Sequence, residues 1–329
     1  MNPSKSTQGI HMYKYIGIDI SKATLDVYDG LRSYKFTNDT KGFKSIIKLA
    51  KEQQHIPKNK LCLIFEPTGV YAYDLMRYCQ AHKIKAIIVG SKVARDYAKS
   101  IKQRSKTDKI DAKVLYRYHT QVDPGSITIP MLDDQILKLS QHRNIYEKYQ
   151  ETIGRFRNLI ESVNKNDKAL MRSLERQINA LQKECLRLLT EIEKIICSID
   201  KNAMHLINLQ TIPGIGKKSA LHLLIEIIRY KDTTAKEMTA LMGLDPVLRD
   251  SGTFKGKSRI SKQGGKSLRT KLYLPTVVAI QYNEHLKVFY ERLVSNGKPK
   301  KLAILAAMRK LLIMALAIVR NKEVYRAPC

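Results

Sequence analysis

Four acidic residues have types and spacings that could hold a divalent metal ion. Asp19 interrupts an apolar run near the N-terminus, and Glu66 directly follows a second apolar run. Asp108 and Asp111 are three residues apart, which would place both carboxylates on one face if the segment is helical. A buried carboxylate is costly unless it is paired, protonated or bound to a cation. Oxygen ligands suit Mg²⁺ or Mn²⁺, and two such ions stabilise the attacking and leaving oxygens of phosphodiester displacement.

Each of these acids also has a simpler explanation. Asp108 and Asp111 alone are typical of a solvated helix face, and Glu66 could be a turn residue before Pro67. The run Gly-Ile-Asp-Ile-Ser around Asp19 is also similar to the phosphate loop of sugar kinases. That class needs a later Gly-rich adenosine motif, whereas this chain continues into a coiled-coil pattern. Because the four acids occur together in a basic chain, we interpret them as a nuclease-like, metal-binding set.

The charge of the chain limits its partners. Lys and Arg number 59 against 30 Asp and Glu, which gives a net charge of +29. Such an excess predicts either nucleic acid or an anionic membrane surface as partner. The longest apolar run, 311–319, is too short to span a bilayer, and no signal-peptide core is found near the N-terminus. We therefore expect a nucleic-acid partner, no membrane and a cytoplasmic location.

Two smaller features agree with this expectation. The five cysteines are scattered without a Cys-x-x-Cys pair, which argues against a zinc site or a disulfide framework and for a reducing compartment. Residues 1–11 are polar and are expected to form a tail, with Met12 as an alternative start.

The first 120 residues alternate apolar strands with helices. Hairpin-like strands come first, and strands alternating with helices follow, which predicts an α/β domain with a mixed sheet. The expected strands are 15–20, 24–28, 34–37, 61–65 and 84–89, and the expected helices are 40–54, 71–82 and 110–119.

The middle of the chain predicts two long helices joined by a turn at 164–167. Apolar residues recur at spacings of four and three on both sides of the turn, with strict alternation over 174–195. This spacing is typical of a coiled-coil seam. We expect chains to pair through residues 133–200, as a homodimer or homotetramer. The alternative is a helical hairpin packed against its own domain.

The last third of the chain begins with a glycine hairpin, Ile212-Pro-Gly-Ile-Gly-Lys217, followed by an apolar helix at 219–228. The hairpin is similar to that of helix-hairpin-helix modules, in which backbone N–H groups and a lysine hold a phosphate. This predicts nucleic-acid contacts from Gly214, Gly216 and Lys217. An ordinary tight turn between helices would have the same pattern.

A cationic loop is expected at 250–271, where glycine, serine and basic residues are concentrated. Lys255, Lys257 and Lys262 are expected to bind nucleic acid there, in a salt-sensitive way. Three further helices are expected, at 273–282, 286–295 and 301–320.

Several motifs resemble one known family over residues 15 to 320. The motifs Gly17-Ile-Asp-Ile-Ser-Lys22, Glu66-Pro-Thr-Gly69 and Lys106-Thr-Asp-Lys-Ile-Asp-Ala112 look like the RuvC-like domain, an RNase H-type fold, of the DEDD transposases of the insertion-sequence 110 family. That family includes the Piv-type DNA invertases. The matching C-terminal stretches are Ile212-Pro-Gly-Ile-Gly216, Gly243-Leu-Asp-Pro246, Asp250-Ser-Gly252, Ile260-Ser-Lys-Gln-Gly264 and Gly297-Lys-Pro-Lys-Lys301.

The resemblance implies a multidomain α/β plus α architecture. A RuvC-like domain would occupy 1–128, a coiled-coil connector 129–205 and a mainly helical transposase domain 206–329. By the same match Asp19, Glu66, Asp108 and Asp111 would be the DEDD tetrad that binds Mg²⁺ or Mn²⁺.

The resemblance also implies a serine nucleophile, and Ser251 takes its position. Many relatives have Ser-Ser-Gly there, whereas this chain has Asp250-Ser251-Gly252. A serine ester conserves the phosphodiester bond during strand exchange without an energy source. The other serines of the loop, Ser258, Ser261 and Ser267, are expected to contact phosphates or to cap helices.

The implied function is that of a DNA transposase or recombinase acting on double-stranded DNA. Many family members use a structured bridge RNA to choose target and donor. Three alternatives stay open: a Piv-type invertase, a junction-resolving nuclease that hydrolyses DNA without Ser251, and an architectural nucleic-acid-binding protein.

Overall fold

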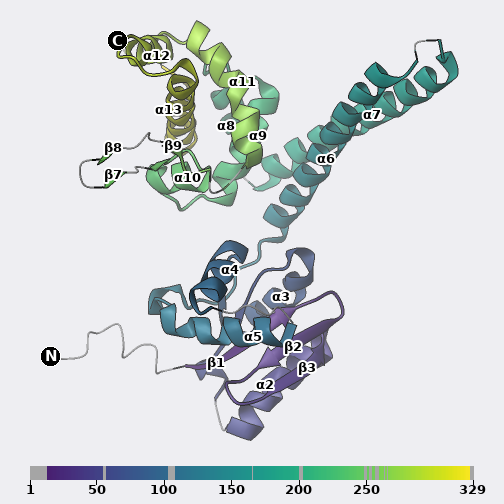
Figure 1. The fold of residues 1–329 in the computed structure, drawn as a ribbon, viewed down its shortest axis with the longest axis vertical. Helices are drawn as coiled ribbons and strands as arrows, with labels where there is room; N and C mark the ends of the chain where they lie inside the picture. The colour runs from purple at the N-terminus through teal and green to yellow at the C-terminus, as the bar shows by residue number, and fades with distance from the viewer. Residues whose placement is uncertain are drawn as a thin grey trace. The chain divides into compact units, whose positions relative to one another are not determined.

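The structure is a computed structural model that describes residues 13–54, 57–102, 108–164, 166–199, 203–247, 250–251, 254–255, 259–262, 264 and 266–326. Within these ranges the side chains of 53–54, 58, 108–109, 124, 247, 250–251, 254–255 and 266 are not described. The chain divides into two compact units, residues 1–133 and 134–329. Figure 1 shows a sheet with helices in the first unit and a mainly helical second unit. The division into three domains stays a prediction.

The first unit is built on a five-stranded mixed sheet of order β3-β2-β1-β4-β5. The first three strands are antiparallel neighbours, and β1, β4 and β5 run parallel. This confirms the expected mixed α/β arrangement. The strands are β1 (Lys14–Ile20), β2 (Thr24–Tyr28), β3 (Ser33–Thr37), β4 (Leu61–Phe65) and β5 (Lys85–Ile88).

Helices pack on both faces of this sheet because its central strands are apolar on both sides. Ile16 and Ile18 of β1 belong to the core beneath α2 (Thr40–Gln54) and α3 (Tyr73–His82). Tyr15 of β1 and Ile64 of β4 point to the opposite face and pack with Leu115 of α5 (Asp108–Arg117). The short helix α4 (Ser91–Ser100) contacts α5. Figure 1 shows α5 crossing the sheet.

Gly17 of β1 permits the close approach of α5. A Cβ atom at this position would lie 2.2 Å from the backbone oxygen of Ala112 and 2.5 Å from the backbone nitrogen of Tyr116. We expect Gly17→Ala to displace α5 and to lower the free energy of unfolding by about 2 kcal/mol, as overpacking of a dense interior does. Urea unfolding measures this, with Gly90→Ala as control, since a Cβ at Gly90 meets nothing within 4 Å. Equal unfolding midpoints for the two variants would contradict the prediction.

The second unit begins with a long helical hairpin, α6 (Asp134–Ser162) and α7 (Lys168–Ile199). This confirms the two long helices and the turn between them. Ile178, Cys185 and Ile192 of the expected seam are buried, in one core with Tyr146 and Ile153 of α6. The apolar seam therefore packs largely inside its own chain. This agrees with the alternative of a helical hairpin packed against its own domain. Pairing between chains stays a prediction.

Six further helices share the core of the second unit. The central helix is α13, which buries Ala307, Leu311 and Ala315 among its neighbours. The segment expected to be a loop, 250–271, instead contains β7 (Asp250–Ser251), β8 (Phe254–Lys255), β9 (Arg259–Ile260) and the start of α11. The strand β7 pairs with β8, and β9 pairs with β6 (Pro246–Val247), which precedes that segment. The helices are α8 (Ala203–Gln210), α9 (Lys217–Arg229), α10 (Ala235–Leu241), α11 (Lys266–Tyr282), α12 (Glu284–Ser295) and α13 (Lys300–Asn321).

By length and composition α13 is apolar enough to cross a membrane, and it is the one described helix of this kind. The apolar run 311–319 therefore underestimated the apolar length of this segment. Half of its most apolar window is buried inside the protein, where it packs against α8, α11 and α12. This packing is that of a core helix.

A buried polar cluster joins α6, α9 and α11. Arg143 of α6 forms an ion pair with Glu226 of α9, and both side chains are nearly buried. The ring of His222, one turn earlier on α9, lies 5.8 Å from that of Tyr146. Burial, followed by the positive charges of Lys271 and Arg143, lowers the pKa of His222 to about 4.

His222 is expected to make the second unit less stable in acid. Its ordinary pKa is 6.5 and its folded pKa is about 4, so between these values the unfolded chain binds the proton more strongly. Stability is therefore lost as the pH falls through this window, by about 3 kcal/mol at most. Urea unfolding at about pH 7 and about pH 4.5 measures the loss. His222→Phe should reduce it, and the exposed-site control His82→Gln should not.

Candidate catalytic centre and nucleic-acid surfaces

Asp19 and Glu66 lie side by side at the carboxyl end of two parallel strands. Ile18 of β1 is in register with Phe65 of β4, so Asp19 and Glu66 follow at the next position of each strand. Neighbouring strands are about 4.8 Å apart. Side chains alternate, so Asp19 shares a face with Gly17, and Glu66 shares that face with Ile64. Both acids therefore stand on the face covered by α5.

The direction of α5 places its first residues near Asp19. His119, just after α5, stacks on Tyr15 with ring centroids 4.6 Å apart. The backbone of Ala112 and Tyr116 lies directly against Gly17. Tyr15 is therefore next to the end of α5, and Gly17, two residues later on β1, is next to the middle of α5. Asp19 is the following residue on the same face of β1, so it lies nearest to the start of α5. A helix N-terminus carries partial positive charge and favours nearby anions.

Asp111 lies in the first turn of α5, and its side chain is half-buried. Asp108 is the first residue of the same helix, which confirms that the segment is helical, but its side chain lies outside the described part of the structure. Among the described side chains, no three of His, Cys, Asp and Glu form a group that could hold a metal ion. The complete tetrad therefore stays a prediction. An all-oxygen donor set at a strand edge suits Mg²⁺ or Mn²⁺ chemically.

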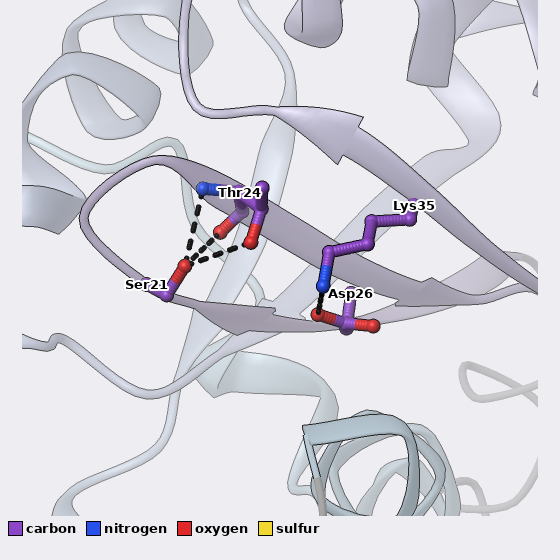
Figure 2. A network of polar contacts seen from close by, with 4 residues as sticks. All are labelled: Ser21, Thr24, Asp26 and Lys35. Carbon is purple, nitrogen blue, oxygen red and sulfur yellow. Dashed lines mark hydrogen bonds and ion pairs between the residues drawn. The ribbon is translucent and has the colours of Figure 1, made fainter.

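Hydrogen bonds tie the ends of β1 and β4 together. The hydroxyl of Thr68, in the loop after Glu66, donates to the backbone oxygen of Ile20 over 3.0 Å. The turn after β1 is closed by Ser21, whose hydroxyl donates to the backbone oxygen of Thr24 (2.8 Å) and accepts from its N–H (3.1 Å), as Figure 2 shows. These bonds restrain the backbone that directly follows Asp19 and Glu66.

A further carboxylate, Asp26, escaped the sequence analysis. It is the cross-strand partner of Asp19 on β2, so both side chains are on one face of the sheet. Asp26 is 4% exposed, and Lys35 of β3 forms an ion pair with it at 3.6 Å, drawn in Figure 2. The signal was available, because Asp26 also interrupts an apolar strand. Its charge is balanced by Lys35.

The glycine hairpin between α8 and α9 has two different glycines. Gly214 has a positive φ of 96°, and a Cβ there would lie 2.6 Å from the backbone nitrogen of Ala279 in α11. The structure thus gives Gly214 a packing role. Gly216 is the N-cap of α9 without a side-chain cap, and its surroundings are open. The exposed start of α9 therefore has the character of an anion site.

Lys217 is the first residue of α9, and its ammonium already forms an ion pair. Its ammonium lies 2.8 Å from a carboxylate oxygen of Glu193 on α7. Lys218 follows it and is exposed. A phosphate at the hairpin would have to share or displace the ion pair of Lys217. Nucleic-acid contacts from Gly214, Gly216 and Lys217 stay predictions.

Ser251 is placed by its backbone alone. It pairs with Phe254 in the β7–β8 ladder, and Asp250 pairs with Lys255. The side chains of Ser251 and Lys255, and the whole of Lys257, lie outside the described residues. Lys262 is exposed and has a positive φ of 55°, in the left-handed region that lysine seldom adopts. Roles for these residues in catalysis and nucleic-acid binding stay predictions.

Two other serines of the region have structural partners. The hydroxyl of Ser261 bonds to the carboxylate of Asp245, and that of Ser267 bonds to the carboxylate of Glu147 on α6. Neither contact was foreseen. Both hydroxyls are engaged within the protein.

Comparison with known protein families agrees with this architecture. A profile of DEDD transposases of the insertion-sequence 110 family, described as "Transposase", matches residues 16–166. A second profile, "Transposase IS116/IS110/IS902 family", matches residues 207–291.

Whole-chain relatives are similar as well. The "Pilin gene-inverting protein" of Moraxella bovis is 32% identical over 321 residues, which cover 94% of this chain and 96% of that protein. The protein of the same name from Moraxella lacunata matches equally. The "Insertion element IS900 uncharacterized 42 kDa protein" of Mycobacterium paratuberculosis is 30% identical over 92 residues, 28% of this chain and 23% of that protein.

These matches define the class as DNA transposases and recombinases. Within it, the chain belongs to the insertion-sequence 110 family of DEDD transposases and recombinases, which includes the Piv-type invertases.

Proposed function

We propose that the chain cleaves and rejoins double-stranded DNA by transesterification through a serine ester at Ser251. The observation that carries the proposal is the meeting of Asp19, Glu66 and the start of α5 at one edge of the sheet, in a chain of the recombinase family. The mixed sheet with an acidic carboxyl edge supports the assignment of a RuvC-like domain to residues 1–128.

The residues divide the chemistry between them. The hydroxyl oxygen of Ser251 forms a bond to phosphorus while a bridging P–O bond breaks, and the released strand hydroxyl takes a proton. The hydroxyl of an incoming strand then attacks the serine ester and restores Ser251, so the number of ester bonds is conserved. Asp19, Glu66, Asp108 and Asp111 would hold Mg²⁺ or Mn²⁺, which when bound stabilises charge on the attacking and leaving oxygens.

The acids belong to the first compact unit and Ser251 to the second. The proposal requires them to meet on DNA, either within one chain or between chains of a homodimer or homotetramer. Several apolar side chains of the α6–α7 hairpin are exposed, among them Leu159, Leu170 and Leu186, at 47%, 45% and 63%. These residues, rather than the buried seam, are available for contacts between chains.

Oligomerisation is expected to be visible in light scattering of the full chain. We expect a mass of two or four chains, and Leu186→Lys should shift it towards the monomer, because a charge replaces an apolar contact. Gln141→Lys is the matched control, because it adds the same charge at an exposed position of α6. A monomer at every concentration, with and without DNA, would contradict the expectation.

The function as a whole is tested with a plasmid that carries the gene of this chain and its native flanking DNA. Purified protein with Mg²⁺ is expected to produce rearranged DNA. Excised or inserted element DNA indicates transposition. Inversion of a segment is the second candidate, favoured by the whole-chain match to pilin gene-inverting proteins. Linear fragments alone would support the junction-resolving nuclease, and bound but unaltered DNA would support an architectural protein.

A guide RNA and a cytoplasmic location complete the proposal. The net charge of +29 accommodates DNA and RNA together. Sequencing of RNA that co-purifies with the protein is expected to return one structured RNA encoded beside the gene. Rearrangement that survives removal of this RNA by ribonuclease would exclude a guide.

A further inference from the structure

A cavity in the second unit lies between the β6–β9 strand pair and helices α12 and α13. Its volume is about 430 Å³, within the range of about 300–1,000 Å³ that is common for ligand sites. Apolar side chains form much of its wall. They include the buried Leu244 and the half-buried Phe289, Leu305, Ala306 and Ile313.

The charged side chains of the described lining are all cations. Arg259 and Lys298 are exposed at the mouth, and Arg309 and Lys310 are half-buried on α13. Among the described residues that line the cavity, none is acidic. Within the described part of the chain none of these four cations forms an ion pair. An apolar wall under four unneutralised positive charges fits a ligand that is apolar at one end and anionic at the other.

Lys310 is held in an unfavourable position for a cation. Its ammonium lies 4.6 Å from the centroid of the Phe289 ring, and Arg292 lies 5.6 Å from the same centroid. Burial, followed by the charge of Arg292, lowers the pKa of Lys310. The Phe289 ring compensates this cation only in part. A bound phosphate would relieve the repulsion between the two cations.

The cavity is close along the chain to the proposed nucleophile. Pro246 and Ile260 line it, and they form the ladder that encloses the β7–β8 pair with Ser251. Ser251 is five positions after Pro246, which limits the distance between their Cα atoms to about 18 Å. At about 3.4 Å per nucleotide of one DNA strand, this reach corresponds to about five nucleotides.

We propose that this cavity binds one unpaired deoxynucleotide of the DNA strand that Ser251 attacks, with the base against the apolar wall and the phosphate among the four cations. The inference rests on the proposed function, because that function brings the strand to the β7–β8 pair. A base leaves the stack at a cost that is smallest where pairing is already lost. The cavity would hold the strand open beside the phosphate to be cleaved and fix its register.

The test compares binding of two DNA duplexes to the full chain without metal. One duplex is fully paired, and the other has a single bulged 2-aminopurine deoxynucleotide. We expect the bulged duplex to bind about tenfold more tightly, as apolar contact with one base provides, with a change in 2-aminopurine fluorescence. Ala306→Phe fills the cavity and should remove this preference. Arg309→Gln should weaken binding of the bulged duplex and reduce its salt slope by about one.

Lys287→Gln is the matched control, because this exposed cation of α12 lies outside the cavity. An unchanged thermal melt shows that each variant is folded, and retained affinity for the paired duplex shows that general DNA binding is intact. Equal binding of both duplexes, or a preference that persists in Ala306→Phe and Arg309→Gln, would overturn the inference. A third arm uses the bulged design in RNA, and a cavity-dependent preference for RNA alone would overturn the assignment to DNA.

The proposed function is tested separately, by an assay for a covalent adduct between DNA and Ser251, and that assay is independent of this binding assay. A cavity-dependent preference without any DNA–serine adduct would remove the proposed function and the strand assignment while leaving a nucleotide-binding cavity. An adduct without the preference would remove only the present inference.

Discussion

Asp19→Asn is expected to abolish DNA cleavage while the chain still folds and binds DNA. The substitution keeps the shape of the side chain on β1 and removes its charge, which a metal ion at this edge would need. Loss of one such charge-stabilising group should reduce the cleavage rate by roughly a thousandfold or more. Cleavage of end-labelled DNA is measured over a range of Mg²⁺ and Mn²⁺ concentrations, together with DNA affinity and the thermal melt.

Two controls test whether the effect is specific to Asp19 or follows from the loss of any carboxylate. Asp74→Asn makes the same change at an exposed position of α3, where Asp74 pairs with Arg77, and should cleave normally. Asp26→Asn changes the cross-strand neighbour of Asp19 and removes the partner of Lys35. It should perturb the metal dependence without abolishing cleavage. Full activity of Asp19→Asn would exclude the tetrad.

The strands of the first unit could be predicted because their signal is local. Ile16, Ile18 and Ile20 alternate with Gly17 and Asp19, and this period of two defines both β1 and its faces. Helix α4 was missed although Val93, Ala94 and Tyr97 recur at helical spacing, because so short a stripe is weak evidence. Helix α10 was missed although Thr234 and Glu237 form a capping box. It has seven residues, too few for a periodic pattern.

The seam of α7 shows a different limit of sequence reasoning. An apolar 4-3 spacing predicts that a helix packs along one apolar stripe, but it does not identify the helix that covers this stripe. Here α6 of the same chain covers Ile178, Cys185 and Ile192. Nothing in the spacing distinguishes a partner in the same chain from one in a second chain.

The sequence suggested a metal-binding set because acids occur at strand edges and at a helix start in a basic chain, and the family resemblance then identified the four acids as one tetrad. Register between β1 and β4 and the contact of Gly17 with Ala112 join residues that are far apart in sequence. No spacing rule connects Asp19 to Asp111. Asp26 was overlooked for the converse reason, because it belongs to none of the motifs that carry the resemblance, although it lies opposite Asp19.

Ser251→Ala is expected to eliminate a covalent DNA–protein adduct and strand exchange, with DNA binding retained. A recombinase that conserves bond energy must hold the cleaved strand on the protein, and alanine has no oxygen to form the ester. The assay uses a suicide substrate whose cleaved fragment diffuses away, a denaturing gel and peptide mapping of the adduct. The unsubstituted chain should give an adduct at Ser251, and the variant should give none.

The neighbouring serines supply the controls and the sharpest contrary results. Ser261 and Ser267 are held by the carboxylates of Asp245 and Glu147, so their hydroxyls serve the fold. Ser261→Ala should therefore form the adduct, with some loss of stability from the lost hydrogen bond. An adduct that maps to Ser258 or Ser261 would show that the nucleophile is misassigned. Free DNA ends released by Ser251→Ala with Mg²⁺ would mean that water is the nucleophile, and the junction-resolving nuclease would then be the correct function.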